Sequence, residues 1–202
     1  MTKDEFAIRL KHGCASITAA EEELTEIDSH FGDADHGLTM SKIAKAIAGA
    51  VEESDGGIQA MLDDAAMAVM TLNGGSAVPL WNTWLDGLQE EAPAGSEINA
   101  EELKTIFTRA LEELSDMSGA KVGDKTMMDA LIPASEAIAA YTGSNENELF
   151  TLAAKAAAEG AEASKGFVSK FGRARSYGEK TIGTPDAGAM SMSYFFQGLA
   201  RA

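Results

Sequence analysis

Three aspartates, Asp28, Asp33 and Asp35, fall within eight residues of one another. Carboxylates this close repel one another, and each raises the pKa of its neighbours. A hard divalent cation removes that cost, and Mg²⁺ prefers carboxylate oxygens while keeping positions for water and phosphate. The loop does not fit an EF-hand, because counting from Asp33 puts Gly37 fifth and Ala44 twelfth, where oxygen ligands are required. A polar turn whose aspartates cap helices is the alternative explanation.

Two glycine-containing loops have residues suited to phosphate. Asn73-Gly74-Gly75-Ser76-Ala77 ends at a predicted helix N-terminus, where free N–H groups and the helix dipole favour anions. It is not a P-loop, because no Gly-Lys-Ser/Thr follows, and no strand precedes it as in a Rossmann turn. Gly172-Arg173-Ala174-Arg175 carries two arginines placed to meet phosphate or a carboxylate. Each loop alone also has a conformational explanation, since glycine is common in turns.

Several other candidate residues have a structural explanation beside the functional one. Asp186 could cap a helix, accept a hydrogen bond from a ribose hydroxyl, or do both. His36 precedes a predicted helix, where histidine is more often a surface or capping residue than a catalytic one. Met128 is by base rate a core residue, although its thioether suits an adenine face. Gly119 and Asp124 fit a glycine C-cap followed by an aspartate N-cap.

Helical periodicity dominates the chain. Phe6, Leu10, Ile17 and Leu24 share one face and predict a helix from about residue 3 to 28. Further helices are predicted after Gly37, over Ile58–Leu72, from Pro79, from an Asn99/Glu102 capping box to Ser118, from Asp124 with a kink or break at Pro133, from an Asn145/Glu148 cap, and from Asp186 to the C-terminus. Residues 172–185 are predicted to form a long loop. No segment alternates like a strand, so we expect one all-α domain of eight helices over residues 1–202.

Composition restricts the class of protein. A net charge of −16 argues against nucleic acid as a partner, because phosphate backbones are bound by clustered Lys and Arg. Such an acidic chain can hold a polyphosphate only where cations or backbone dipoles reverse the local sign. The lone Cys14 excludes an internal disulfide, and no apolar leader or 18-residue apolar run is present. We therefore expect a cytoplasmic protein with no membrane partner.

Five motifs, in order along the chain, resemble the nucleotide-binding (L) domain of dihydroxyacetone kinases. They are the acidic loop Asp28–Gly37, Gly123–Leu131 with Pro133-Ala134, Gly172-Arg173-Ala174, Gly178–Gly183 and Pro185–Ala189. The resemblance covers essentially the whole chain. It implies an eight-helix antiparallel barrel that binds ADP or ATP at one end.

The resemblance also implies roles for particular residues. Asp28, Asp33 and Asp35 are expected to bind two Mg²⁺ ions that bridge the nucleotide phosphates. The nucleotide itself is expected to contact a larger set of residues: His36, Gly37, Leu38, Thr39, Ser76, Ala77, Gly119, Met128, Arg173, Asp186, Ala187 and Gly188. No segment remains to bind the ketose, so a separate ketose-binding kinase subunit is the expected partner, docked at the nucleotide end. This places the expected activity, a phosphotransferase of the dihydroxyacetone kinase type, in glycerol metabolism.

The chain departs from the family pattern at three turns. Gly74-Gly75-Ser76-Ala77-Val78-Pro79-Leu80 has its hydroxyl shifted by one place and a valine where a glycine is usual. Arg175 stands where serine is more usual, and Ala187 where proline is common. We interpret these differences as marks of a divergent branch acting on a related ketose or tetrulose. Phosphorylation of dihydroxyacetone alone in a substrate panel would contradict this hypothesis.

Two questions stay open at this point. The phosphoryl donor is either a permanently bound ADP recharged by a phosphohistidine protein of the phosphotransferase system, or exchangeable ATP. The alternative to a kinase is a non-catalytic nucleotide sensor that acts through protein contacts. Retention of all three aspartates argues against the sensor, since a sensor could lose metal ligands.

Overall fold

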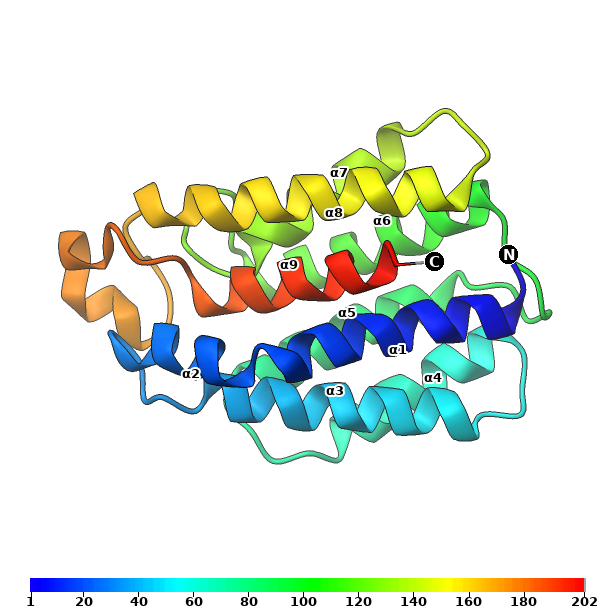
Figure 1. The fold of residues 1–202 in the computed structure, drawn as a ribbon, viewed down its shortest axis with the longest axis horizontal. Coiled ribbons are helices and arrows are strands. Elements are labelled where there is room, and N and C mark those ends of the chain that lie inside the picture. Colours follow the sequence, from blue (N-terminus) through cyan, green and yellow to red (C-terminus); the bar gives the residue numbers. More distant parts are fainter. Residues whose placement is uncertain (202) are drawn as a thin grey trace.

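The computed structural model describes residues 1–201, and these residues form a barrel of antiparallel helices (Figure 1). The elements are α1 (Lys3–Ala19), α2 (Glu21–Ser29), α3 (His36–Glu53), α4 (Ile58–Met70), α5 (Ala77–Glu90), α6 (Ala100–Ser118), α7 (Met128–Ala140), α8 (Glu146–Ala163), the 3₁₀ helices η1 (Ser164–Gly166) and η2 (Arg173–Thr181), and α9 (Ala187–Leu199). Within the described residues there is no strand, and Thr2 and Glu97 form one isolated antiparallel bridge. The predicted all-α class is confirmed.

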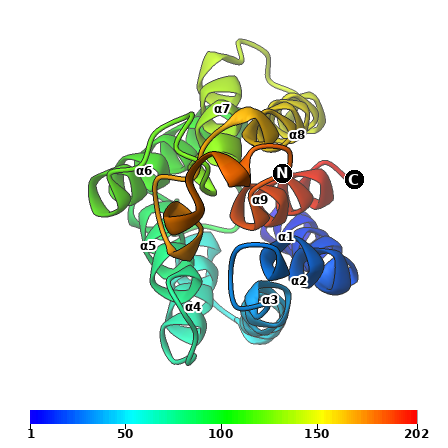
Figure 2. The same ribbon diagram turned by 90° about the vertical axis from the view of Figure 1, so that its left-hand side faces the viewer.

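The helices close into a ring. Taken in the order α1, α3, α4, α5, α6, α7, α8 and α9, each helix packs against the next, and α9 packs back against α1. Figure 2 looks onto one end of this ring, where η2 and the loop between α2 and α3 lie in front. With α1 and α2 counted as one bent rod, this is the predicted eight-helix barrel.

Aromatic side chains fill the centre of the barrel. Trp81 and Trp84 from α5 meet Phe195 from α9 edge to face, with ring centroids 5.3 and 5.5 Å apart. Phe107 from α6 and Phe196 from α9 extend the cluster, their centroids 5.9 Å apart. All five rings are buried. Because aromatic side chains bury large apolar areas, this cluster makes the barrel a packed core and not a pore.

The first predicted helix is two helices, because Ala20 leaves helical geometry with φ −96° and ψ 10°. Three successive glutamates follow, Glu21 to Glu23, and acidic residues stabilise the N-terminal turn of a new helix. The break redirects α2 toward the start of α3. There a Cβ on Gly37 would lie only 2.0 Å from the backbone oxygen of Glu21, so glycine is required for the contact.

The remaining boundaries differ by a turn or less, with one exception. α5 begins at Ala77, which places Pro79 in the first turn, where no backbone N–H is needed. α7 begins at Met128 and not at Asp124, because Gly123 and Lys125 have left-handed backbones (φ 94° and 61°), and the helix continues through Pro133. The exception is the predicted loop at residues 172–185, which contains η2. Among residues 1–201, no helix is both long and apolar enough to cross a membrane.

Candidate functional site

One end of the barrel holds a cavity of about 490 Å³. Its walls come from segments far apart in the sequence, from Ile27 to Gly188, and include the N-terminal residues of four helices: His36 of α3, Ala77 of α5, Met128 of α7 and Ala187 of α9. The first-turn N–H groups of a helix have no partner within the helix, and the helix dipole is positive at that end. Four such ends around one cavity favour a negatively charged ligand.

Three of these four helix ends lack a side-chain cap. The side chains of the N-cap residues of α3, α5 and α7 (Asp35, Ser76 and Met127) accept no hydrogen bond from the first turn, although at α7 the Thr126 hydroxyl accepts from the Met128 N–H at 3.2 Å. At the opposite end of the barrel, α1, α6 and α8 are capped by Thr2, Asn99 and Asn145. The predicted Asn99/Glu102 capping box is confirmed, with both of its hydrogen bonds present. α4 also starts at the opposite end and has no side-chain cap, but its first N–H groups donate to the backbone oxygens of Gly95 and Pro93. Backbone donors therefore remain available to a ligand at the cavity end, at the starts of α3 and α5.

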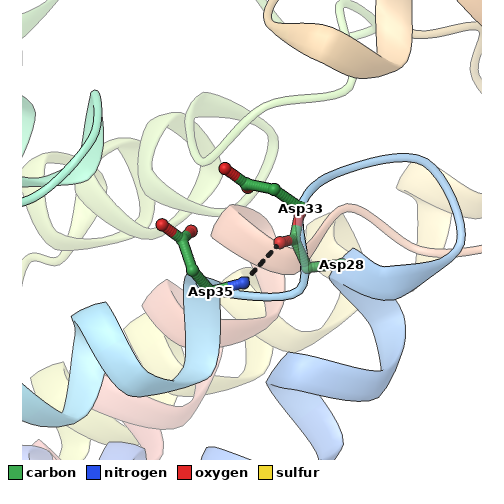
Figure 3. Close-up of side chains that lie close together, drawn as sticks. All are labelled: Asp28, Asp33 and Asp35. Atoms are coloured by element: carbon green, nitrogen blue, oxygen red, sulfur yellow. Dashed lines mark hydrogen bonds between the residues drawn. The ribbon is translucent and has the colours of Figure 1, made fainter.

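The three aspartates meet at the rim of this cavity (Figure 3). Asp28 comes from the last turn of α2, Asp33 from the following loop, and Asp35 from the N-cap of α3. One carboxylate oxygen from each lies within 4.8 Å of the others. The backbone N–H of Asp35 donates to a carboxylate oxygen of Asp28 at 3.2 Å, which fixes the turn.

The donor set and its geometry fit a hard divalent cation. Three carboxylates on one rim offer the oxygen ligands that Mg²⁺ prefers and leave room for water and phosphate. At Gly32, a Cβ would lie 2.0 Å from a carboxylate oxygen of Asp28, so a larger residue here would displace that carboxylate from the cluster. Partial desolvation, followed by the charges of Asp33 and Asp28, raises the pKa of the Asp35 carboxyl above its ordinary value. A bound cation would reverse this shift.

Arg173 reaches the acidic loop from η2. Its guanidinium forms an ion pair with the carboxylate of Asp33, 140 residues away in the sequence. Close by, the rings of Phe31 and Tyr177 lie in contact with centroids 5.2 Å apart. The predicted partner of Arg173 was a phosphate or a carboxylate, and in this structure it is a carboxylate. Arg175 is exposed and does not line the cavity.

His36 is held between α3 and α9. Its Nε2 lies 3.2 Å from the Ser191 hydroxyl, and that hydroxyl donates to the backbone oxygen of Gly188 at 2.9 Å. The hydroxyl can therefore accept a hydrogen bond from the ring. Burial lowers the pKa of His36, so the ring is neutral near pH 7. With its single N–H directed to Ser191, the neutral ring leaves Nδ1 as an uncharged acceptor at the start of α3.

Asp186 and Lys125 belong to a polar network in the wall of the cavity. The Lys125 ammonium donates to the backbone oxygens of Ser164 (2.7 Å) and Thr184 (2.5 Å). The Ser164 hydroxyl in turn accepts from the backbone N–H of Asp186 at 2.9 Å, and Asp186 caps α9 through Ala189 at 2.8 Å. Burial raises the pKa of Asp186 to about 7, and burial lowers the pKa of Lys125. The network fixes the turn from which α9 starts.

Most of the predicted site residues share this cavity. The three aspartates line it, as do His36, Thr39, Ser76, Ala77, Met128, Arg173, Asp186, Ala187 and Gly188. Met128 is buried, which confirms the core interpretation, and it also lines the cavity, so its contact with a nucleotide stays a prediction. The predicted C-cap at Gly119 is confirmed by its left-handed backbone.

Three predicted nucleotide contacts are not among the lining residues. Gly37 is buried against the start of α2. Leu38 is exposed to solvent outside the cavity. Gly119 serves as the C-cap, while its neighbours Ser118 and Ala120 line the wall. Each of the three residues is next in sequence to a residue that lines the cavity, but does not itself line it.

Other lining residues were not predicted. Lys125, Ser169 and Phe171 belong to this group. The left-handed backbone of Lys125 has no sequence signal, because glycine is the usual residue there. Ser169 and Phe171 reach the cavity only through the path of the chain from η1 to η2, which no local motif specifies.

The sequence has relatives of known activity. L-erythrulose kinase of Pectobacterium atrosepticum is 35% identical over 187 residues, which cover 88% of this chain but 31% of that protein. The chain thus spans about a third of the length of the erythrulose kinases it matches. The PEP-dependent dihydroxyacetone kinase ADP-binding subunit DhaL of Escherichia coli K12 is 31% identical, over 94% of this chain and 92% of that protein.

A solved structure has the same fold. The dihydroxyacetone kinase from C. freundii, crystallised with AMP-PNP and Mg²⁺, matches with a TM-score of 0.73 at 24% identity, over 96% of this chain and 33% of that one. Residues 30–201 of the sequence match the DAK2 domain. With most of its length matched to that domain and a relative of equal size above 30% identity, this chain belongs to the DAK2 domain family.

Proposed function

We propose that this chain is the nucleotide-binding subunit of a two-component kinase, with ADP or ATP and Mg²⁺ bound in the cavity at the end of the barrel. The observation that carries the proposal is the meeting of three carboxylates with four helix N-termini at one cavity. A cation-binding rim next to an anion-binding wall suits a metal-bound polyphosphate. The name of the relative of equal size, an ADP-binding subunit, supports it.

In this proposal, Asp28, Asp33 and Asp35 hold two Mg²⁺ ions. The ions supply charge neutralisation and alignment of the phosphates, which are the main requirements of phosphoryl transfer. The free N–H groups at the starts of α3 and α5 donate to phosphate oxygens, and the Arg173 guanidinium offers a further cationic donor. His36 and the turn at Asp186 position the rest of the nucleotide.

The ketose is bound elsewhere. The erythrulose kinases are about three times as long as the stretch that matches this chain, so their additional length can contain a ketose site. We infer that a separate subunit presents dihydroxyacetone or a related small ketose, such as a tetrulose, to the open end of the cavity. The phosphotransferase is then active only when the two subunits are together.

Exposed apolar side chains support docking at that end. Met70 ends α4, Met117 lies in the last turn of α6, and Val122 and Tyr177 lie in loop and η2 segments around the cavity. Each is about half exposed, and together they offer a partner several apolar contacts at this end. Methionine side chains adapt well to a partner surface.

Calorimetric titration with ADP and ATP, with and without Mg²⁺, tests the nucleotide site. Binding should require Mg²⁺ and should be lost in Asp33→Ala. Asp64→Ala, an exposed carboxylate on α4 outside the cavity, is the matched control and should bind normally. Protein shown to be nucleotide-free that binds neither nucleotide would overturn the proposal.

Two further observations resolve the remaining choices. ADP that survives dialysis would identify a bound cofactor recharged by a phosphohistidine protein, whereas freely exchanging ATP would be a co-substrate. Nucleotide binding without turnover in the presence of ketose-binding subunits would favour a nucleotide sensor over a kinase.

A further inference from the structure

Arg173 lies in the segment of residues 165–183, whose two ends are joined by hydrogen bonds. Between these two ends, the backbone N–H of Ser169 donates to the Thr181 hydroxyl at 3.0 Å, and the backbone N–H of Gly183 donates to the backbone oxygen of Lys165 at 2.7 Å. Within the segment, Gly172 and Gly178 have left-handed backbones (φ 59° and 57°). Two contacts join its exposed outer part to the acidic loop: the Arg173–Asp33 ion pair and the Phe31–Tyr177 ring contact.

This segment has the opposite charge from the rest of the molecule. Residues 165–182 carry five basic residues and one acidic residue in a chain of net charge −16. Lys170 pairs with Asp124 in the loop before α7, and Lys165 pairs with Glu162 in α8, so neither of these two cations reaches the aspartate cluster. Arg173 is the basic residue of the segment that pairs with one of the three clustered aspartates.

An arginine in this position competes with a cation for Asp33. The guanidinium neutralises the same carboxylate that a divalent ion requires as a ligand, so one must weaken the hold of the other. A phosphate group is an alternative partner of at least equal quality, because guanidinium binds phosphate through two parallel hydrogen bonds. A nucleotide in the cavity would offer such a phosphate beside the acidic loop.

We propose that Arg173 couples the binding of nucleotide to the binding of metal by exchanging partners. Without ligand, Arg173 holds Asp33 and lowers the affinity of the aspartates for a cation. When a nucleotide enters, its phosphate takes the guanidinium and releases Asp33 to the metal. This inference rests on the proposed function, and it adds that the coupling is reciprocal: metal and nucleotide raise each other's affinity by the same factor.

Removal of the guanidinium tests the exchange. Mn²⁺ serves as the probe cation, because its free ion is counted directly by electron paramagnetic resonance. Without nucleotide, Arg173→Ala should bind Mn²⁺ about two- to fivefold more tightly than the wild type, the range for an exposed ion pair. With saturating metal, the same variant should bind ADP on the order of tenfold more weakly, because a charge-assisted hydrogen bond is lost. The coupling factor therefore falls in Arg173→Ala.

Arg175→Ala is the matched control. It removes one positive charge two residues away, from an exposed side chain outside the cavity, and so measures the general effect of charge on metal binding. Equal changes in Mn²⁺ affinity for the two variants would overturn the exchange, as would an unchanged coupling factor in Arg173→Ala. Absence of metal-dependent ADP binding in the wild type would instead overturn the proposed function itself.

Discussion

The Asp186 side chain caps α9 and has a raised pKa. Its pKa is raised to about 7, so the folded protein holds this proton more tightly than the unfolded chain does. Between the unfolded pKa near 4 and the folded pKa near 7, the free energy of unfolding therefore falls as pH rises. The cap of α9 needs only an oxygen acceptor, which an amide also supplies.

Asp186→Asn should remove this pH dependence while keeping the cap. We expect the variant to gain stability over the wild type as pH rises from 5 to 8, by on the order of 1–2 kcal/mol. Urea unfolding at both pH values measures the difference. A difference that does not change with pH would contradict the raised pKa.

Lys125 ties together segments that meet only in the folded chain. Lys125→Met keeps the length of the side chain but leaves the backbone oxygens of Ser164 and Thr184 without their donor. Each unsatisfied buried acceptor costs about 1–3 kcal/mol, so we expect the free energy of unfolding to fall by about 2 kcal/mol or more. Lys121→Met, an exposed lysine in the same loop, should change stability little in the same urea experiment. Equal losses in the two variants would refute the role of the network.

At the scale of elements, local signals could be predicted and non-local ones could not. The Asn99 and Asn145 caps and the Gly119 C-cap follow from residues within a turn of one another, and all three are present. The break at Ala20 and the 3₁₀ helix η2 have no such signal. At the break, the start of α2 packs closely on Gly37 of α3, a contact with the next helix that no residue within a turn of Ala20 signals.

The candidate site divides in the same way. The aspartate loop could be found because its three carboxylates are close in sequence. That four helix N-termini converge on the same cavity depends on the closure of the ring of helices, which pairs α9 with α1. Lys125 could not be found, because its role depends on the backbone oxygens of Ser164 and Thr184, which folding brings to it.

Glycines within helices give a matched test of how closely these elements pack. In α8, a Cβ on Gly160 would lie 2.0 Å from the backbone oxygen of Asp129 in α7, whereas a Cβ on the exposed Gly49 of α3 would meet nothing within 4 Å. Gly49→Ala should stabilise the protein by about 0.5–1 kcal/mol, because alanine loses less backbone entropy in a helix. Gly160→Ala should destabilise it by about 2 kcal/mol or more, because backbone must move. Thermal unfolding of both variants measures these changes. A stabilised Gly160→Ala would show that α7 and α8 lie further apart than this structure places them.

At the scale of the whole molecule, the two ends of the barrel differ in what they offer to other molecules. At the far end, side chains cap α1, α6 and α8, whereas at the cavity end α3 and α5 have no side-chain cap. The aspartate rim and several exposed apolar side chains also lie at the cavity end. A chain of net charge −16 repels other acidic proteins at long range. Docking is therefore expected to depend on apolar contact at the cavity end, where the basic η2 segment also lowers the repulsion.

Substitutions at Met117 and Leu152 test whether the partner docks at the cavity end of the barrel. Both are apolar and about half exposed, but Met117 lies in the last turn of α6 beside the cavity, and Leu152 lies on α8 away from it. A glutamate at a buried contact leaves a charge without water, so Met117→Glu should lower kcat/KM with a ketose-binding subunit by about tenfold or more. Leu152→Glu should leave kcat/KM unchanged, and both variants should bind Mg²⁺–ADP as the wild type does. Loss of activity in Leu152→Glu alone would place the docking surface on the wall of the barrel and not at its open end.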